Sequence, residues 1–306
     1  MTQTQAGLVV AAYGRHCLVE SADGQRRICH PRGKKSQSVV GDHVLWQATG
    51  DEGTIERVVE RRNLLYRQDE IRTKSFAANL DLVIMLLAAD PEWSESQLTR
   101  ALIAAEAQHI PVLIVLNKSD LSDLFERAWV RLAPYRRMGH TVLPLCLNAE
   151  HTQGLGALLD HLRGKNSLVL GPSGVGKSSL VNRLVPDAQA QTGEISRALN
   201  SGKHTTTSTT WYWVGEGRHT GLIDSPGFQA FGLHHIEPMQ LAHLMPDFLD
   251  TLGHCKFYNC THLHEPGCAV QAQVGVDAGD GLGPAISENR YRLYRELFTE
   301  LSQTRY

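Results

Sequence analysis

The chain has 306 residues, of which 42% are hydrophobic and 20% charged, and its formal net charge is −2. This length suits two or three domains, and the composition is that of a globular protein rather than a disordered or fibrous one. The near-neutral charge means that any contact with RNA must come from local basic patches. The sequence contains no recognisable signal peptide and no run of about eighteen apolar residues, so we expect a cytoplasmic protein outside the membrane.

Residues 1–70 contain about five short apolar runs of β type, separated by turn residues, which predict a small all-β barrel of the OB type. The segment between Gln25 and Gly41 carries five basic residues and no acidic one: Arg26, Arg27, Arg32, Lys34 and Lys35. Barrels of this type commonly bind oligonucleotides, so these residues are candidate RNA contacts. The alternative is a solvated basic hairpin on a domain that only covers its neighbour.

Residues 71–230 alternate apolar runs with helical patterns. The continuous apolar runs at 82–87 and 111–116 predict buried parallel strands, and Ser94 has capping-box spacing to Gln97 for a helix between them. A second unit follows, with a helical pattern at 121–138 and a strand at 141–147. The alternation predicts a parallel α/β sheet covered on both faces.

Asn117, Lys118, Ser119 and Asp120 directly follow the second strand, at the sheet edge where such folds bind ligands. They have the pattern N-K-x-D by which GTPases select guanine. The carboxylate of Asp120 can accept hydrogen bonds from guanine N1–H and the 2-amino group, a donor pair that adenine lacks. Asn148 and Ala149 lie where a Ser-Ala pair usually supports the base. The prediction is GTP rather than ATP; the alternative is a surface turn.

A glycine-rich segment follows the apolar run at 168–170 and precedes a helical pattern. It matches the phosphate-binding loop of nucleotide-binding proteins and reads Gly171, Pro172, Ser173, Gly174, Val175, Gly176, Lys177, Ser178 and Ser179. Its backbone N–H groups and the N-terminus of the next helix favour an anion. Lys177 is placed to reach the β- and γ-phosphates, and the Ser178 hydroxyl to bind Mg²⁺. A glycine-rich turn without a ligand is the alternative.

Two further segments match the switches of GTPases. Residues 186–210 are polar and lie where the first switch belongs, so Thr206 is the candidate ligand for Mg²⁺ and contact for the γ-phosphate. Its neighbours Thr205 and Thr207 are the alternatives. The D-x-x-G pattern that follows the apolar run at 221–223 assigns γ-phosphate sensing to Asp224 and Gly227.

Phe228 occupies the position at which many GTPases carry a glutamine that orients the attacking water. A phenyl ring cannot orient water, so another residue must do so. His204, beside the candidate threonine, is the candidate catalytic residue. The alternative is a histidine that only makes hydrogen bonds within its loop.

The order of these motifs is unusual, because the base-reading pattern at 117 precedes the phosphate loop at 171. In ordinary GTPases the phosphate loop comes first. The order predicts a circular permutation, which a nucleotide site tolerates because strand ends converge on one ligand wherever the chain is cut.

Residues 231–306 contain a compact group of metal-ligand residues. Three thiols and one imidazole within fourteen residues suit a tetrahedral structural Zn²⁺ site made by Cys255, Cys260, His262 and Cys268. His254 or His264 could replace His262, and three unliganded thiols are a further alternative. From Ser287 the pattern predicts a helix, whose arginines at 290, 292 and 295 are either solvated charges or contacts to RNA.

Taken together, these motifs resemble the ribosome small-subunit-dependent GTPase (RsgA) family over essentially the whole chain. The residues that carry the resemblance are Asn117 to Asp120, Gly171 to Ser179, Gly202 to Thr207, Asp224 to Phe228, and Cys255, Cys260, His262 and Cys268.

The resemblance implies a multidomain chain with an N-terminal OB-type barrel that binds RNA at 1–70, a circularly permuted α/β P-loop GTPase domain at 71–230 and a mainly helical zinc-binding domain at 231–306. It implies a bacterial cytoplasmic factor for late maturation of the small ribosomal subunit. Such a factor binds the subunit and its rRNA in the GTP state, hydrolyses GTP to GDP when the subunit stimulates it, and is then released. We expect a monomer with one structural Zn²⁺ that uses Mg²⁺ with GTP.

Two other functions are compatible with the nucleotide motifs. A metabolic kinase would need an acceptor pocket and a base for the acceptor hydroxyl, and the sequence contains no recognisable set of this kind. A binding module would hold the nucleotide as a structural ligand only. Release of GDP and phosphate from GTP without any metabolite distinguishes a GTPase from a kinase. A Lys177→Ala or Ser178→Ala variant that abolishes turnover but preserves function in cells would favour the binding module.

Overall fold

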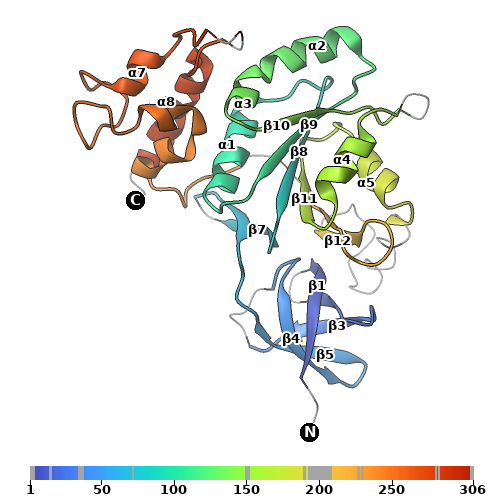
Figure 1. Cartoon of the computed structure of the whole chain (residues 1–306). Helices are drawn as coiled ribbons and strands as arrows, with labels where there is room; N and C mark the ends of the chain where they lie inside the picture. The colour runs from blue at the N-terminus through green and yellow to red at the C-terminus, as the bar shows by residue number, and fades with distance from the viewer. Residues whose placement is uncertain are drawn as a thin grey trace.

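The chain is described by a computed structural model that covers residues 4–13, 16–33, 38–70, 72–148, 152–188, 191, 209–225, 228, 231–279, 281 and 283–303. A β-barrel at the N-terminal end lies below an α/β sheet, and a helical C-terminal part packs beside that sheet, next to α1 (Figure 1). Among the described residues, none of the helices combines the length and the apolar character needed to cross a membrane.

The N-terminal barrel closes on itself in the order β1-β2-β3-β5-β4-β1. Its strands are β1 (Gln5–Tyr13), β2 (His16–Glu20), β3 (Arg26–Pro31), β4 (His43–Thr49) and β5 (Glu52–Val58). All pairs are antiparallel except β3 with β5. Buried side chains alternate along β4 and fill the interior with Val44 and Trp46, so the predicted barrel is confirmed.

A two-stranded hairpin, β6 (Leu64–Gln68) and β7 (Thr73–Ala78), leads from the barrel to the sheet. The sequence analysis did not predict it, because its strands do not show a regular alternation of apolar and polar residues. The hairpin buries Phe76, whose ring stacks on Phe231 with the centroids 5.3 Å apart. The hairpin therefore packs against the segment that follows the D-x-x-G motif.

The central sheet has the order β10-β9-β8-β11-β13-β12. Its strands are β8 (Leu82–Ala88), β9 (Val112–Asn117), β10 (Thr141–Pro144), β11 (Asn166–Leu170), β12 (Thr210–Trp213) and β13 (Gly221–Asp224). The strands are parallel except β12, which is antiparallel to β13 and also pairs with β1 of the barrel. All seven residues of β8 are buried, as a sheet covered on both faces requires. The predicted parallel sheet is confirmed.

Helices cover the two faces of this sheet. They are α1 (Glu95–Glu106), α2 (Ser122–Arg131), α3 (Ala133–Arg137), α4 (Leu155–Leu162) and α5 (Lys177–Leu184). The Ser94 hydroxyl accepts a hydrogen bond from Gln97 N at 3.3 Å, so the predicted cap of α1 is confirmed. Leu98 of α1 and Leu158 of α4 belong to separate hydrophobic clusters, one for each face. Helix α4 is an element that the sequence analysis missed.

The C-terminal part consists of two 3₁₀ helices and two α-helices: η1 (Pro238–Leu244), η2 (Pro246–Thr251), α7 (Ala269–Gln273) and α8 (Glu288–Ser302). The Ser287 hydroxyl accepts a hydrogen bond from Arg290 N and begins α8. The buried face of α8 carries Leu293, Tyr294, Leu297 and Phe298.

Arg290 lies on this buried face, so the expectation that it is solvated or contacts RNA is wrong. It is 2% exposed, and its Nε and Nη2 donate to the two carboxylate oxygens of Asp247 at 2.9 and 2.8 Å. Its Nη1 donates to the Thr99 hydroxyl of α1 at 2.8 Å. The arginine therefore ties the C-terminal part to the central sheet.

We expect Arg290→Ala to lower the free energy of unfolding by about 3–5 kcal/mol, because it leaves the carboxylate of Asp247 buried without its partner. The measurement is guanidinium-induced unfolding at equilibrium. Arg292→Ala is the matched control on the same helix, since Arg292 forms an exposed pair with Glu296 that contributes about 0.5 kcal/mol. Equal losses in the two variants would contradict the role given to Arg290.

Candidate nucleotide and metal sites

The three nucleotide motifs lie at one edge of the central sheet. Asn117 is the last residue of β9, the glycine-rich loop begins directly after β11, and Asp224 is the last residue of β13. These strands are parallel, so their carboxyl ends face the same side. The strand order reverses between β8 and β11, and such a reversal opens a crevice in which α/β sheets bind ligands.

The base-reading turn and the phosphate loop touch each other. Asn117 is 3% exposed, and its Nδ2 donates to the carbonyl oxygen of Val175 at 2.9 Å. A Cβ placed on Gly176 would lie 2.5 Å from that same Nδ2, and Gly176 has φ of 101°. Only glycine therefore fits this position, and two segments distant in sequence are held together.

Both carboxylate oxygens of Asp120 receive a hydrogen bond from the loop after β10. Cys146 Sγ donates to Oδ1 and Asn148 Nδ2 donates to Oδ2, each at 3.3 Å. The backbone N–H of Ser119 donates to Leu145 O at 3.1 Å. Sequence reasoning missed Cys146; the signal that could have found it is its position between β10 and Asn148. These bonds fix the orientation of the carboxylate.

The phosphate loop starts close to β8 and ends in α5. A Cβ on Gly171 would lie 2.2 Å from Leu86 O, so the loop begins where only a glycine fits. Lys177 Nζ donates to the carbonyl oxygens of Gly171 and Pro172 at 2.6 and 2.7 Å, across the base of the loop. The side chains of Ser178 and Ser179 are exposed at the first turn of α5.

The charges of Lys177 and Asp224 influence the pKa values of both groups in this site. Burial lowers the pKa of Lys177, and the charge of Asp224 opposes that shift. Burial raises the pKa of Asp224, and Lys177 opposes it in turn. A partly desolvated ammonium beside a helix N-terminus favours the binding of a polyphosphate. Next to them, the hydroxyls of Thr209 and Ser225 lie 3.0 Å apart and connect the ends of the two switch segments.

Several predicted residues lie outside the described residues, and their roles stay predictions: Lys34, Lys35, Ala149, His204, Thr206 and Gly227. Phe228 is described and is 6% exposed. Its ring packs against Phe231 with the centroids 5.8 Å apart, so this aromatic belongs to the hydrophobic core.

The described members of the basic segment have partners on neighbouring barrel strands. Arg26 Nε donates to Glu20 at 2.8 Å, and Arg32 pairs with Glu56. Arg27 donates to Gly50 O at 2.9 Å. Residues 25–41 contain no acidic residue, but the fold brings two acidic residues from other strands, Glu20 and Glu56, next to these arginines. The positive charge available for RNA is therefore smaller than the sequence suggested.

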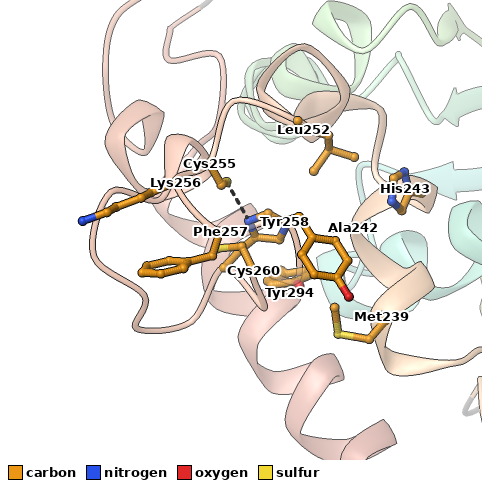
Figure 2. Close-up of a pocket in the computed structure, with 12 residues that line it drawn as sticks. Met239, Ala242, His243, Leu252, Cys255, Lys256, Phe257, Tyr258, Cys260 and Tyr294 are labelled. Atoms are coloured by element: carbon orange, nitrogen blue, oxygen red, sulfur yellow. Dashed lines mark hydrogen bonds between the residues drawn. The ribbon is translucent and has the colours of Figure 1, made fainter.

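The three thiols and the imidazole of the C-terminal part converge, with their ligand atoms all within 4.8 Å of one another. His262 Nδ1 lies 3.5 Å from Cys255 Sγ and 3.4 Å from Cys268 Sγ, and these two sulfurs are 4.0 Å apart. A tetrahedral zinc ion with Zn–S of about 2.3 Å separates such donor atoms by about 3.6–3.8 Å. The four residues fit zinc. Two of them, Cys255 and Cys260, are labelled in the close-up of the adjoining pocket (Figure 2).

Outer contacts hold three of these four residues in place. The backbone N–H groups of Ala269 and Gln271 donate to the sulfurs of Cys255 and Cys268 at 3.3 and 3.5 Å. Tyr291 of α8 donates to the carbonyl oxygen of His262 at 2.8 Å. Such N–H···S contacts stabilise thiolate charge, and they connect the cluster to α7 and α8.

Comparison with known proteins identifies the family. The model of the RsgA GTPase family matches residues 58–234. The chain belongs to the RsgA GTPase family. A relative from Variovorax paradoxus (strain S110), named small ribosomal subunit biogenesis GTPase RsgA, is 69% identical over 300 residues, which cover 98% of this chain and 93% of that one. A relative of the same name from Paraburkholderia xenovorans (strain LB400) is 50% identical and covers 97% and 93%.

Solved structures agree with this family and with the permuted order. The crystal structure of YjeQ from Thermotoga maritima has a TM-score of 0.72 at 29% identity, covering 99% of this chain and 100% of that one. YloQ, described as a circularly permuted GTPase, has a TM-score of 0.70 at 27% identity, with coverage of 99% and 98%. The RsgA-type chain is therefore a circularly permuted GTPase, as its motif order predicted.

We expect Asp120→Asn to weaken GTP binding by about 100-fold, because an amide replaces an acceptor of two charge-assisted hydrogen bonds. Xanthosine triphosphate, which has a carbonyl at C2, should bind the variant better than the wild type. Titration calorimetry measures both affinities. Asp123→Asn, an exposed acid in the first turn of α2, is the control. An unchanged ratio of GTP to xanthosine triphosphate affinity would refute the assignment of Asp120.

Proposed function

We propose that this GTPase acts in the late biogenesis of the small ribosomal subunit. It binds the subunit and its rRNA in the GTP state and is released after hydrolysis that the subunit stimulates. The observation that carries GTP as the ligand is the contact of Asn117 with Val175, which joins a guanine-type turn to a phosphate loop. The ribosomal role is supported by the names of relatives that match over nearly the whole chain.

The residues of the site divide the work. Asp120 reads the guanine edge, Asn148 and Ala149 support it, and the backbone of residues 171–179 holds the phosphates. Lys177 leaves the carbonyl oxygens of its own loop and donates to the phosphates instead. The Mg²⁺ held by the hydroxyls of Ser178 and Thr206 would neutralise the charge that develops on the phosphates. Asp224 and Gly227 sense the γ-phosphate.

The hydrolytic step needs a group that orients water, and Phe228 is buried in the core. We assign this task to His204, which accepts or positions a proton of the attacking water. Stimulation by the subunit follows if subunit binding places His204 against the attacking water. GTP and the subunit then favour the same arrangement of the switches. Hydrolysis of GTP ends that arrangement, and the protein leaves the subunit.

The same proposal divides the chain into a barrel at 1–70, a GTPase domain at 71–230 and a zinc domain at 231–306. The hairpin β6–β7 crosses the first boundary and serves as the connector. The barrel arginines Arg26, Arg27 and Arg32, with Lys34 and Lys35, contact rRNA. One structural Zn²⁺ per chain holds the C-terminal loop, and the protein acts as a cytoplasmic monomer.

Purified small subunits should raise the turnover of GTP to GDP and phosphate, whereas large subunits should not. His204→Ala should lower the stimulated rate by roughly 100-fold, as the loss of a positioned acid–base group does. Phosphate release in the absence of any metabolite is the measurement. His109→Ala, an exposed residue between α1 and β9, is the control. Equal stimulation by both subunits would contradict the ribosomal role, and an unchanged rate in His204→Ala would contradict the catalytic one.

The metal assignment predicts one zinc ion per chain by elemental analysis. Cys260→Ala should lose the ion and lower the melting temperature by several degrees, because metal binding contributes directly to folding. His264→Ala should keep the ion, since His264 is exposed and lies outside the group of four converging residues. Zinc retained by Cys260→Ala would show that the four residues are not the ligands.

A further inference from the structure

A buried carboxylate lies where the barrel meets the central sheet. Glu20, the last residue of β2, is 5% exposed. Its Oε2 accepts from Arg26 Nε at 2.8 Å, and its Oε1 accepts from the indole Nε1 of Trp213 at 2.8 Å. Arg218 Nη1 lies 3.9 Å from Oε1. A desolvated carboxylate depends on such partners, and here they come from both parts of the molecule.

The partners on the sheet side belong to a single hairpin. Trp213 ends β12, and Arg218 lies in the turn between β12 and β13. The guanidinium of Arg218 lies so close to Gly24, in the turn after β2, that a Cβ there would come within 1.6 Å of it. A cavity of about 350 Å³, lined by Glu20, Trp213 and Arg218 among others, lies beside them.

Strand β12 connects this contact to the nucleotide site. Ala11 of β1 pairs with Thr210 of β12, and Thr210 pairs with Asp224 of β13. Neighbouring strands lie about 4.8 Å apart, so Asp224 is about 10 Å from the barrel strand. The hydroxyl of Thr209, one residue before β12, lies 3.0 Å from that of Ser225. A displacement of β12 therefore reaches both switch segments.

We propose that Glu20 is a positioning residue that couples the barrel to Asp224 through β12. When an RNA phosphate binds Arg26, Glu20 loses the partner of its Oε2. Its remaining attraction to Trp213 and Arg218 then draws the β12–β13 turn toward the barrel. Asp224 moves with that hairpin, and the rate of GTP hydrolysis responds although RNA does not touch the nucleotide.

The RNA half of this inference rests on the proposed function, whereas the coupling itself does not. A coupling free energy between two sites is reciprocal, so a barrel that biases Asp224 must itself respond to the nucleotide. The response of the barrel to GTP can be measured on the chain alone, without ribosomal subunits.

The first experiment is hydrogen–deuterium exchange of the full chain with GDP or with a non-hydrolysable GTP analogue. Peptides that cover β2 and β3 should change their exchange rate by roughly threefold between the two nucleotides. The difference should vanish in Glu20→Gln and in Trp213→Phe, which removes the indole N–H and keeps an aromatic ring. It should persist in Asp160→Asn, whose side chain forms an exposed pair with Arg163 at the end of α4.

The proposal is overturned if the wild-type barrel does not respond to the nucleotide, or if Glu20→Gln responds as the wild type does. Thermal unfolding checks that each variant is folded. Should Glu20→Gln fail to fold, Trp213→Phe and Arg218→Lys decide the question in the same assay.

The second experiment measures turnover with small subunits. Glu20→Gln should lower the ratio of stimulated to basal kcat by roughly tenfold while its basal kcat stays near the wild-type value, because the coupling is engaged only when RNA occupies Arg26. A merely structural role would lower basal kcat and stability together. The same ratio in wild type and variant would overturn the coupling. A wild-type chain that small subunits do not stimulate would contradict the proposed function instead, and the exchange experiment then decides the coupling alone.

Discussion

The nucleotide site depends on one contact, the hydrogen bond from the Asn117 amide to the backbone of Val175. It joins the end of β9 to the loop after β11, across the intervening strand β8. The bond requires parallel strands that end at the same level and a glycine at 176, where a Cβ would collide with the amide. Because the contact is made in space, the order of the two segments along the chain is free, and the permuted order costs the site nothing.

The parts of this fold that local sequence determines could be predicted. The buried strands β8 and β9 are continuous apolar runs. The four candidate zinc ligands lie within fourteen residues, so their spacing alone predicts the cluster. The hairpin β6–β7 and the support of Asp120 by Cys146 could not be predicted in the same way. The two strands of the hairpin pair locally, but the side chains that they bury pack against the distant Phe231, and Cys146 is likewise distant from Asp120. The periodicity of a single segment carries no information about such partners.

Arg290 is a different kind of miss, because the signal was present. It is four residues before Tyr294 and seven before Leu297, and both are buried, so helical periodicity places all three on one face of α8. The charge of the arginine argued for solvent, and tertiary structure reversed that argument by bringing Asp247 and Thr99 to the same place. A charged residue on an apolar helical face is therefore better interpreted as one half of a buried pair than as an exposed charge.

The burial of Phe228 connects the fold to the chemistry. Its ring packs against Phe231, and Phe231 in turn stacks on Phe76, so Phe228 is held in place through the same hairpin that connects the barrel to the sheet. A side chain fixed in a hydrophobic core cannot swing toward an attacking water. Packing thus excludes the side chain of Phe228 itself as the water-orienting group. The proposed mechanism therefore assigns that role to His204, and a large binding partner could place such a residue against the attacking water.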